Sequence, residues 1–143
     1  MRSNPSIEAQ ITYEVRIGND RDAQLILDQP KFRADGWLGS YRVRLESPKM
    51  SAEVFVDNAP YGESPVEYFQ TLNKNWRGWE GEKSWRALED EYGLSATMSR
   101  TGHVTLTARL NVYSYLWEAR AKLDIEAGHL ETVANELQKF FKQ

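Results

Sequence analysis

The chain has 143 residues, 27% of them charged, with a net charge of −3 and no cysteine. This length suits one domain, and the mixture of apolar and charged residues excludes a mainly disordered or fibrous protein. The missing cysteines exclude disulfides, zinc–thiolate sites and iron–sulfur clusters, and the acidic balance gives no drive towards nucleic acid or an anionic membrane.

We predict a single domain over residues 1–143, in which residues 1–6 form a flexible N-terminal tail. Met1 to Ser6 lack the apolar segment of a signal peptide. No apolar run approaches the roughly 20 residues of a membrane-spanning helix. The expected location is therefore the cytoplasm.

Alternating apolar and polar residues predict strands through the first third of the chain. A long strand is expected over residues 7–17, and a weaker one near 23–27 follows a turn-like Gly18-Asn19-Asp20. Residues 41–45 and 52–56 alternate on either side of a turn that contains Ser47-Pro48. These last two strands are expected to form a hairpin.

A helix is expected to begin after residue 64. Ser64 suits the N-cap, Pro65 suits the first helical position, and Glu67 completes a capping box. The apolar stripe has the spacing of a helix: Val66, Phe69, Leu72 and Trp76. Residues 76–81 contain two glycines and should end the helix in an irregular loop.

Strand patterns return in the second half of the chain. Residues 85–91 fit either a short helical turn or the entrance to a strand, whereas 92–98, 104–112 and 117–125 alternate clearly. A closing helix is expected over residues 129–142. Its apolar stripe comprises Leu130, Val133, Ala134, Leu137, Phe140 and Phe141.

The pattern predicts an α+β fold of two layers. Short connections favour antiparallel pairing, so we expect one sheet of about six to seven strands with both helices on its apolar face. No internal repeat is evident. The opposite face should mix Arg42, Arg44, Arg109 and Arg120 with acidic neighbours, which favours a solvated ion-pair lattice over a phosphate-binding groove.

The second half also carries a set of motifs that resembles a known family. The motifs are Trp79-Glu80-Gly81-Glu82-Lys83-Ser84-Trp85, Gly102-His103-Val104-Thr105-Leu106, Gly128-His129-Leu130-Glu131 and Phe140-Phe141. Together they resemble a family of small bacterial domains of unknown function. Some such families sit beside toxin genes and are suspected to be immunity proteins. The resemblance covers roughly residues 68–141 and implies no reaction, cofactor or catalytic residue.

An aromatic cluster is the most unusual feature of the sequence. Trp76, Trp79 and Trp85 lie within ten residues and are joined upstream by Tyr61. Exposed aromatic rings beside a glycine-bearing loop can stack on sugars, bases or a partner's side chains. Packing in the core is the alternative for each tryptophan.

Other chemistry is weakly indicated. His103 and His129 lack the spacing of a metal site, so we expect hydrogen-bonded histidines, no metal and no cofactor. Glu80, Glu82 and residues 89–91 could supply a carboxylate pair beside the tryptophans, yet glutamates are numerous in this chain. No nucleophile elbow or phosphate loop occurs, so we do not expect an enzyme.

The leading hypothesis is a non-catalytic cytoplasmic domain that binds another protein, in an immunity-like role. Trp79 and Tyr61 would be buried in the partner, and Glu63, Glu80 and Glu82 would steer a basic surface. The alternative is a small-molecule or carbohydrate-binding module that uses the aromatic loop Trp76–Trp85. No nucleic acid or membrane partner is expected, and a homodimer through a sheet edge is open.

Overall fold

The computed structural model describes residues 13–19, 21–58, 64–112 and 116–142. The predicted tail over residues 1–6, the first half of the strand expected over 7–17, and the site candidates Tyr61 and Glu63 lie outside these ranges. The strand is observed from Glu14 onwards.

Within these described ranges, eight strands form two antiparallel sheets of four. The first sheet contains β1 (Glu14–Asn19), β2 (Ala23–Phe32), β3 (Leu38–Ser47) and β4 (Met50–Asp57), in chain order. The second contains β5 (Lys83–Arg86), β6 (Tyr92–Met98), β7 (His103–Val112) and β8 (Trp117–Glu126), again in chain order. The predicted hairpin is confirmed, because Ser47 pairs with Met50 across a two-residue turn.

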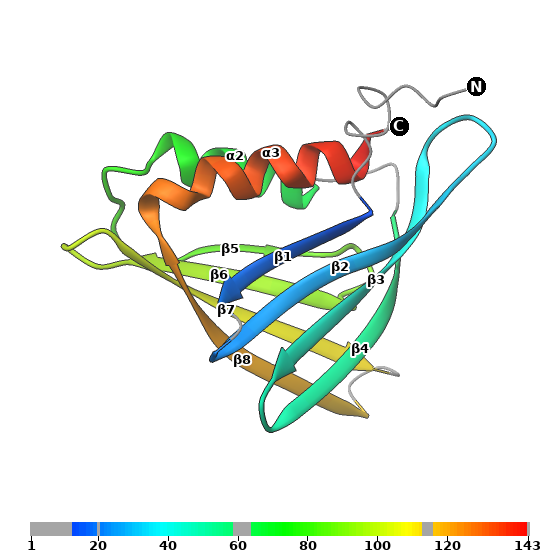
Figure 1. Cartoon of the computed structure of the whole chain (residues 1–143), viewed down its shortest axis with the longest axis horizontal. Helices are drawn as coiled ribbons and strands as arrows, with labels where there is room; N and C mark the ends of the chain where they lie inside the picture. The colour runs from blue at the N-terminus through cyan, green and yellow to red at the C-terminus, as the bar shows by residue number, and fades with distance from the viewer. Residues whose placement is uncertain (1–12, 20, 59–63, 113–115, 143) are drawn as a thin grey trace, which may run out of the picture.

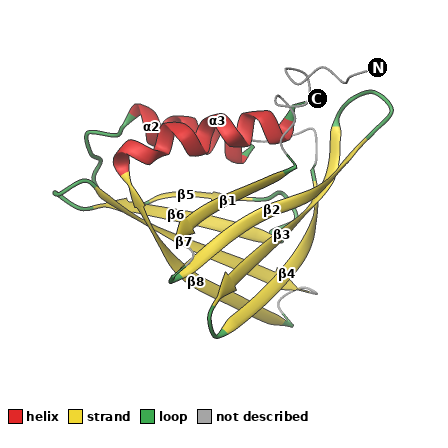
Figure 2. Ribbon diagram, viewed as in Figure 1, coloured by secondary structure: helices red, strands yellow, loops and turns green. Residues whose placement is uncertain are grey.

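Each sheet is followed by a helix. α2 (Pro65–Lys74) follows the first sheet, and a short 3₁₀ turn, η1 (Ala127–His129), leads from the second sheet into α3 (Leu130–Phe141). Figure 1 shows the two helices lying side by side along one side of the sheets, and the colours of Figure 2 separate this helical layer from the strands. The order of four strands and a helix therefore occurs twice, a repeat of architecture that the sequence does not reveal.

The α+β class and the antiparallel pairing are confirmed, but the prediction of a single sheet with six to seven strands is wrong. Alternation tells which face of a strand is buried and leaves its pairing partner open. The chain leaves the first sheet after β4, passes through α2 and starts a new sheet with β5. That strand has only four residues, too few for its alternation to stand out.

The core lies where the apolar faces of both sheets and both helices meet. β8 contacts β1 and β2, β7 contacts β4, and α3 contacts β1. The closing helix is confirmed, with its predicted stripe buried apart from the half-buried Phe141. Tyr68 ties α2 to the second sheet, because its hydroxyl donates to the carbonyl of Lys83 at 2.7 Å.

The start of α2 agrees with prediction in its backbone and differs in its capping. Ser64 is the N-cap and Pro65 the first helical residue, as expected, but no side-chain capping hydrogen bond forms. The prediction of a capping box formed by Ser64 and Glu67 is therefore wrong. The proline at the first helical position lacks an N–H, so one of the four unpaired donors at the start of the helix is absent without a cap.

Candidate functional site

The loop after α2 and the β6–β7 turn enclose a surface hollow of about 720 Å³. The loop contributes Trp76 to Trp79, the turn contributes Met98 to Gly102, and Ala127 closes one side. We call this the tryptophan hollow. It joins the loop after α2 to one end of the second sheet.

Trp76 is the exposed ring of this hollow. α2 ends at Lys74 and Asn75 is its C-cap, so Trp76 has left the helical stripe that the sequence predicted for it. The side chain is 52% exposed, and the Arg77 guanidinium carbon lies 5.2 Å from the ring centroid. A cation over an indole ring in this range is held by the ring quadrupole. Trp76 and Arg77 thus form one exposed, stacked pair.

Trp79 fixes the loop to the second sheet. Gly78 has a φ of 132°, which reverses the chain directly before Trp79. The indole Nε1 donates to the Ala96 carbonyl at 3.2 Å, and the ring packs against the hydrophobic core. Trp79 therefore anchors the loop, while its neighbour Trp76 faces solvent.

The other predicted site residues are dispersed. Trp85 lies on β5, packs edge-to-face on Tyr92 with centroids 5.1 Å apart, and does not line the tryptophan hollow. Glu80 and Glu82 are exposed, and the Glu82 carboxylate accepts from the Ser84 hydroxyl at 3.3 Å. Among the described candidates, Trp76 and Trp79 share the tryptophan hollow, whereas Glu82 and Trp85 line a separate hollow on the second sheet.

A second hollow of about 420 Å³ lies between the helices and the end of the first sheet. Aromatic residues from β3, β5, α3 and the loop before β3 line it: Trp37, Tyr41, Trp85 and Phe141. Trp37 donates from Nε1 to the Asn58 carbonyl at 2.9 Å. Sequence reasoning missed Trp37 because it stands alone in a loop, far in sequence from the other tryptophans.

A buried polar contact joins the two sheets. The hydroxyls of Tyr41 on β3 and Tyr92 on β6 lie 2.7 Å apart, and burial raises the pKa of both groups. Glu91 accepts from the Asp57 backbone N–H at 3.1 Å, while its Oε1 is buried without a partner. Burial raises the pKa of Glu91 despite this hydrogen bond.

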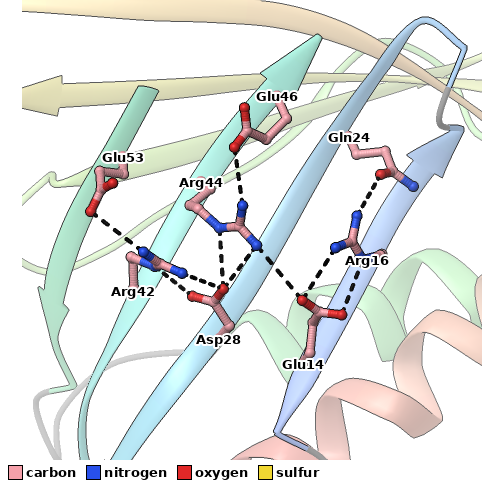
Figure 3. Close-up of polar contacts among 8 residues, drawn as sticks. All are labelled: Glu14, Arg16, Gln24, Asp28, Arg42, Arg44, Glu46 and Glu53. Carbon is pink, nitrogen blue, oxygen red and sulfur yellow. Dashed lines mark hydrogen bonds and ion pairs between the residues drawn. The ribbon is translucent and has the colours of Figure 1, made fainter. Parts of the chain in front are cut away.

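The outer face of the first sheet carries an ion-pair lattice (Figure 3). Asp28, only 7% exposed, lies at its centre. Arg42 donates to both carboxylate oxygens at 2.8 Å, and Arg44 donates from Nε at 3.1 Å. Three further carboxylates complete the arginines' surroundings: Glu14, Glu46 and Glu53. The predicted lattice is thus observed around Arg42 and Arg44, whereas Arg109 and Arg120 belong to the other sheet.

The balance of forces on Asp28 favours its charged form. Burial by itself would raise the pKa of the carboxyl, but the hydrogen bonds and charges of Arg42 and Arg44 outweigh burial and lower it. The same interaction raises the pKa of Arg42. Asp28 is accordingly a fixed anion that neutralises the middle of this face.

The two histidines lie apart from these hollows. The Nδ1 atom of His103 is 3.3 Å from the Glu126 carboxylate at an exposed end of the second sheet, and His129 is exposed before α3. Within residues 13–19, 21–58, 64–112 and 116–142, no group of three or more His, Asp or Glu side chains could hold a metal ion. No helix in those ranges combines the length and apolarity needed to cross a membrane.

Comparison with known proteins gives a family and one distant structural likeness. No curated protein matches the sequence. A solved structure described as crystal structures of Trypanosoma bruciei MRP1/MRP2 is similar over 97% of this chain and 94% of that chain, with 12% identity and a TM-score of 0.48. A family model matches residues 16–143, which include every strand from Arg16 onwards and both helices. The chain therefore belongs to DUF6228, a family of unknown function.

Proposed function

We propose that this chain is a non-catalytic protein-binding domain whose contact surface is centred on Trp76 and Arg77. The observation that carries the proposal is the stacked pair: an indole that is 52% exposed, with a guanidinium 5.2 Å from its centroid. Tryptophan and arginine dominate the energetic centres of protein interfaces. A ring held by its neighbour also loses less side-chain freedom on binding.

The surroundings support a pre-formed surface. Trp79, tied to Ala96, fixes the loop that presents Trp76, so the partner meets an ordered ring. Glu80 and Glu82 are exposed on the same loop, where they would steer a basic partner during encounter. Trp76 therefore replaces Trp79 as the residue that enters the partner.

The carboxylates near the loop have positions that favour binding over catalysis. Glu80, Glu82 and Glu89 are exposed and lack the burial that tunes a general acid. Asp90 pairs with Arg109 at 2.9 Å, and Glu91 holds the Asp57 amide. The resemblance to small bacterial domains beside toxin genes extends the proposal to an immunity-like role in a bacterial cytoplasm.

The experiment compares the full chain with its Trp76→Ala variant. Each is immobilised, proteins from the native cell are captured, and the affinity of the captured protein is then measured by biolayer interferometry. We expect Trp76→Ala to weaken binding about 30-fold, which corresponds to an interface tryptophan at a binding hot spot. Because the ring is exposed, the melting temperature should change by no more than about 2 °C.

Trp117→Ala is the matched control. Trp117 is 41% exposed and begins β8, whereas Ala127 of the tryptophan hollow follows the other end of this ten-residue strand, about 30 Å away. The control should bind as the wild type does. Equal binding by both variants, or unfolding of Trp76→Ala in circular dichroism, would remove Trp76 from the contact surface.

The hollow beside the helices favours a second candidate, a small-molecule or carbohydrate-binding module. Its volume of about 420 Å³ falls within the size range of ligand sites, and Trp37 and Trp85 offer rings for stacking. A thermal-shift screen with glucose, maltose and lactose tests this candidate. A sugar that raises the melting point of the wild type but not of Trp37→Ala would support it, and no shift with any sugar would contradict it.

A further inference from the structure

The outer face of the second sheet carries a row of arginines over a floor of small residues. Four positions stand in register across the strands: Arg86, Gly93, Arg109 and Arg120. The adjacent row carries hydroxyl groups: Ser84, Ser95 and Thr107. These residues line a hollow of about 500 Å³, which we call the arginine hollow.

The charges around this hollow are arranged differently from those of the first sheet, where Arg42 and Arg44 each lie within ion-pair distance of two or more carboxylates. Arg109 and Arg120 are direct cross-strand partners, an arrangement in which like charges repel. Arg120 pairs with Glu118 at 3.0 Å, and Glu82 borders the hollow. Among the residues that the structure describes, no carboxylate lies within ion-pair distance of Arg86.

Arg109 is held in place by Asp90, which is itself held by Asn111. Its Nη2 atom donates to Asp90 at 2.9 Å, and Asn111 in turn donates to the Asp90 carbonyl at 2.8 Å. A Cβ atom on Gly93 would lie 2.8 Å from Nη2 of Arg109, so the glycine lets the guanidinium lie across β6. A cation fixed before binding costs less conformational freedom when a ligand arrives.

We propose that the arginine hollow binds a compact phosphoryl anion, either free phosphate or the phosphate group of a small organic molecule. Arg86 and Arg120 would donate from either side, and the hydroxyls of Ser95 and Thr107 would donate from the floor. Guanidinium groups match the several oxygens of a phosphoryl group through paired hydrogen bonds. The volume leaves room for a ligand larger than phosphate itself.

The surroundings favour a compact anion over a long polyanion. Glu82 lines the hollow and Glu118 pairs with Arg120, so successive phosphates of a nucleic acid strand would approach both carboxylates. The net charge of −3 adds a general repulsion. The arginine hollow shares no lining residue with the tryptophan hollow, so this proposal stands independently of the proposed protein contact.

The test is a titration of the ¹⁵N-labelled full chain, at constant ionic strength, with inorganic phosphate and separately with adenosine 5′-monophosphate. We expect saturable shifts of the Gly93, Ser95 and Thr107 amides with either probe. Equal affinities would assign recognition to the phosphate group alone, and tighter binding of the nucleotide would add contacts to the rest of that molecule. Both outcomes support the arginine hollow as the site.

A variant with both Arg86→Gln and Arg120→Gln should bind about tenfold more weakly, because two charge-assisted donors are lost. Arg33→Gln is the matched control: Arg33 and Arg120 have side chains that are 59% and 60% exposed, and each pairs with one carboxylate. Wild-type affinity in the double variant would overturn the proposal. So would shifts centred on Trp76, or tighter binding of a single-stranded oligonucleotide than of the monophosphate.

Discussion

Removal of the Asp28 charge should destabilise the protein strongly, although the residue lies on an outer face. Arg42 makes two contacts of 2.8 Å with this carboxylate and Arg44 adds contacts of 3.1 and 3.0 Å. Loss of one partner from a buried ion pair typically costs about 3–5 kcal/mol, because the remaining charges stay poorly solvated. We expect the lower end, about 3 kcal/mol, for Asp28→Asn.

We expect the lower end of this range of unfolding free energies because other carboxylates of the lattice remain beside the arginines. Arg42 keeps Glu53 at 3.8 Å, and Arg44 keeps Glu46 at 3.0 Å, so neither arginine is left alone. For a chain of this size, about 3 kcal/mol corresponds to a fall in melting temperature of roughly 6–12 °C. Urea and thermal unfolding at pH 7, followed by circular dichroism, measure both quantities.

The pH dependence of the unfolding free energy tests the role of Asp28 independently. The folded pKa of Asp28 lies below its unfolded value of 3.8, so the carboxylate's contribution is complete above about pH 5 and is lost as the pH falls through the folded pKa. The stability difference between wild type and Asp28→Asn should therefore shrink below pH 3.8. Glu53→Gln is the control: this half-exposed partner should cost no more than about 1 kcal/mol. Equal effects of the two substitutions would refute the central role of Asp28.

Three further substitutions and one association test address other parts of the fold. Burial raises the folded pKa of Glu91, so the charged form of this carboxyl opposes folding at neutral pH. Glu91→Gln should therefore raise the melting temperature at pH 8. At pH 4 the variant and the wild type should melt at similar temperatures. Tyr41→Phe should cost about 1–2 kcal/mol in urea unfolding, because the buried Tyr92 hydroxyl loses its partner. Gly18→Ala should cost about 1–3 kcal/mol, since the residue has a φ of 103° and the new Cβ would lie 2.5 Å from the Ala23 carbonyl oxygen. If β4, an outermost strand of the first sheet, mediates a homodimer, light scattering should give twice the mass of 16.6 kDa; a single-chain mass at high concentration would exclude it.

Alternation predicted most strands correctly because each has one apolar face directed at the core. It does not single out Asp28, because Leu25, Ile26 and Leu27 precede this residue as a continuous apolar run. Ile26 is buried on the outer face, between Arg16 and Arg44 in the strand register, and the aliphatic stems of these arginines account for its burial. A face that is polar in composition can therefore hold a buried aliphatic residue and a buried carboxylate.

The aromatic cluster was predictable as a set of residues but not as a site. Trp76 follows the C-cap of α2, so a difference of two residues in the end of the helix moves it from the core to the surface. Trp85 faces inward because it pairs with the buried Leu94 across β5 and β6, and the sequence left that segment open between helix and strand. Single residues at element boundaries decide exposure, and boundaries are where periodicity carries least information.

The two sheets share one order of strands, so the difference between their outer faces arises from the side chains that each carries. In the first sheet, Asp28 on the second strand lies directly opposite Arg42 on the third strand. The Arg42 guanidinium therefore forms its ion pair with the residue across the strand. In the second sheet, Gly93 stands opposite Arg109, which must cross β6 to reach Asp90. An aspartate fills the middle of one face, whereas a glycine in the middle of the other face leaves room for the Arg109 guanidinium beside the arginine hollow. Replacement of this glycine by aspartate (Gly93→Asp) should therefore weaken phosphate binding. Unchanged binding would show that the difference between Asp28 and Gly93 does not determine which sheet binds the anion.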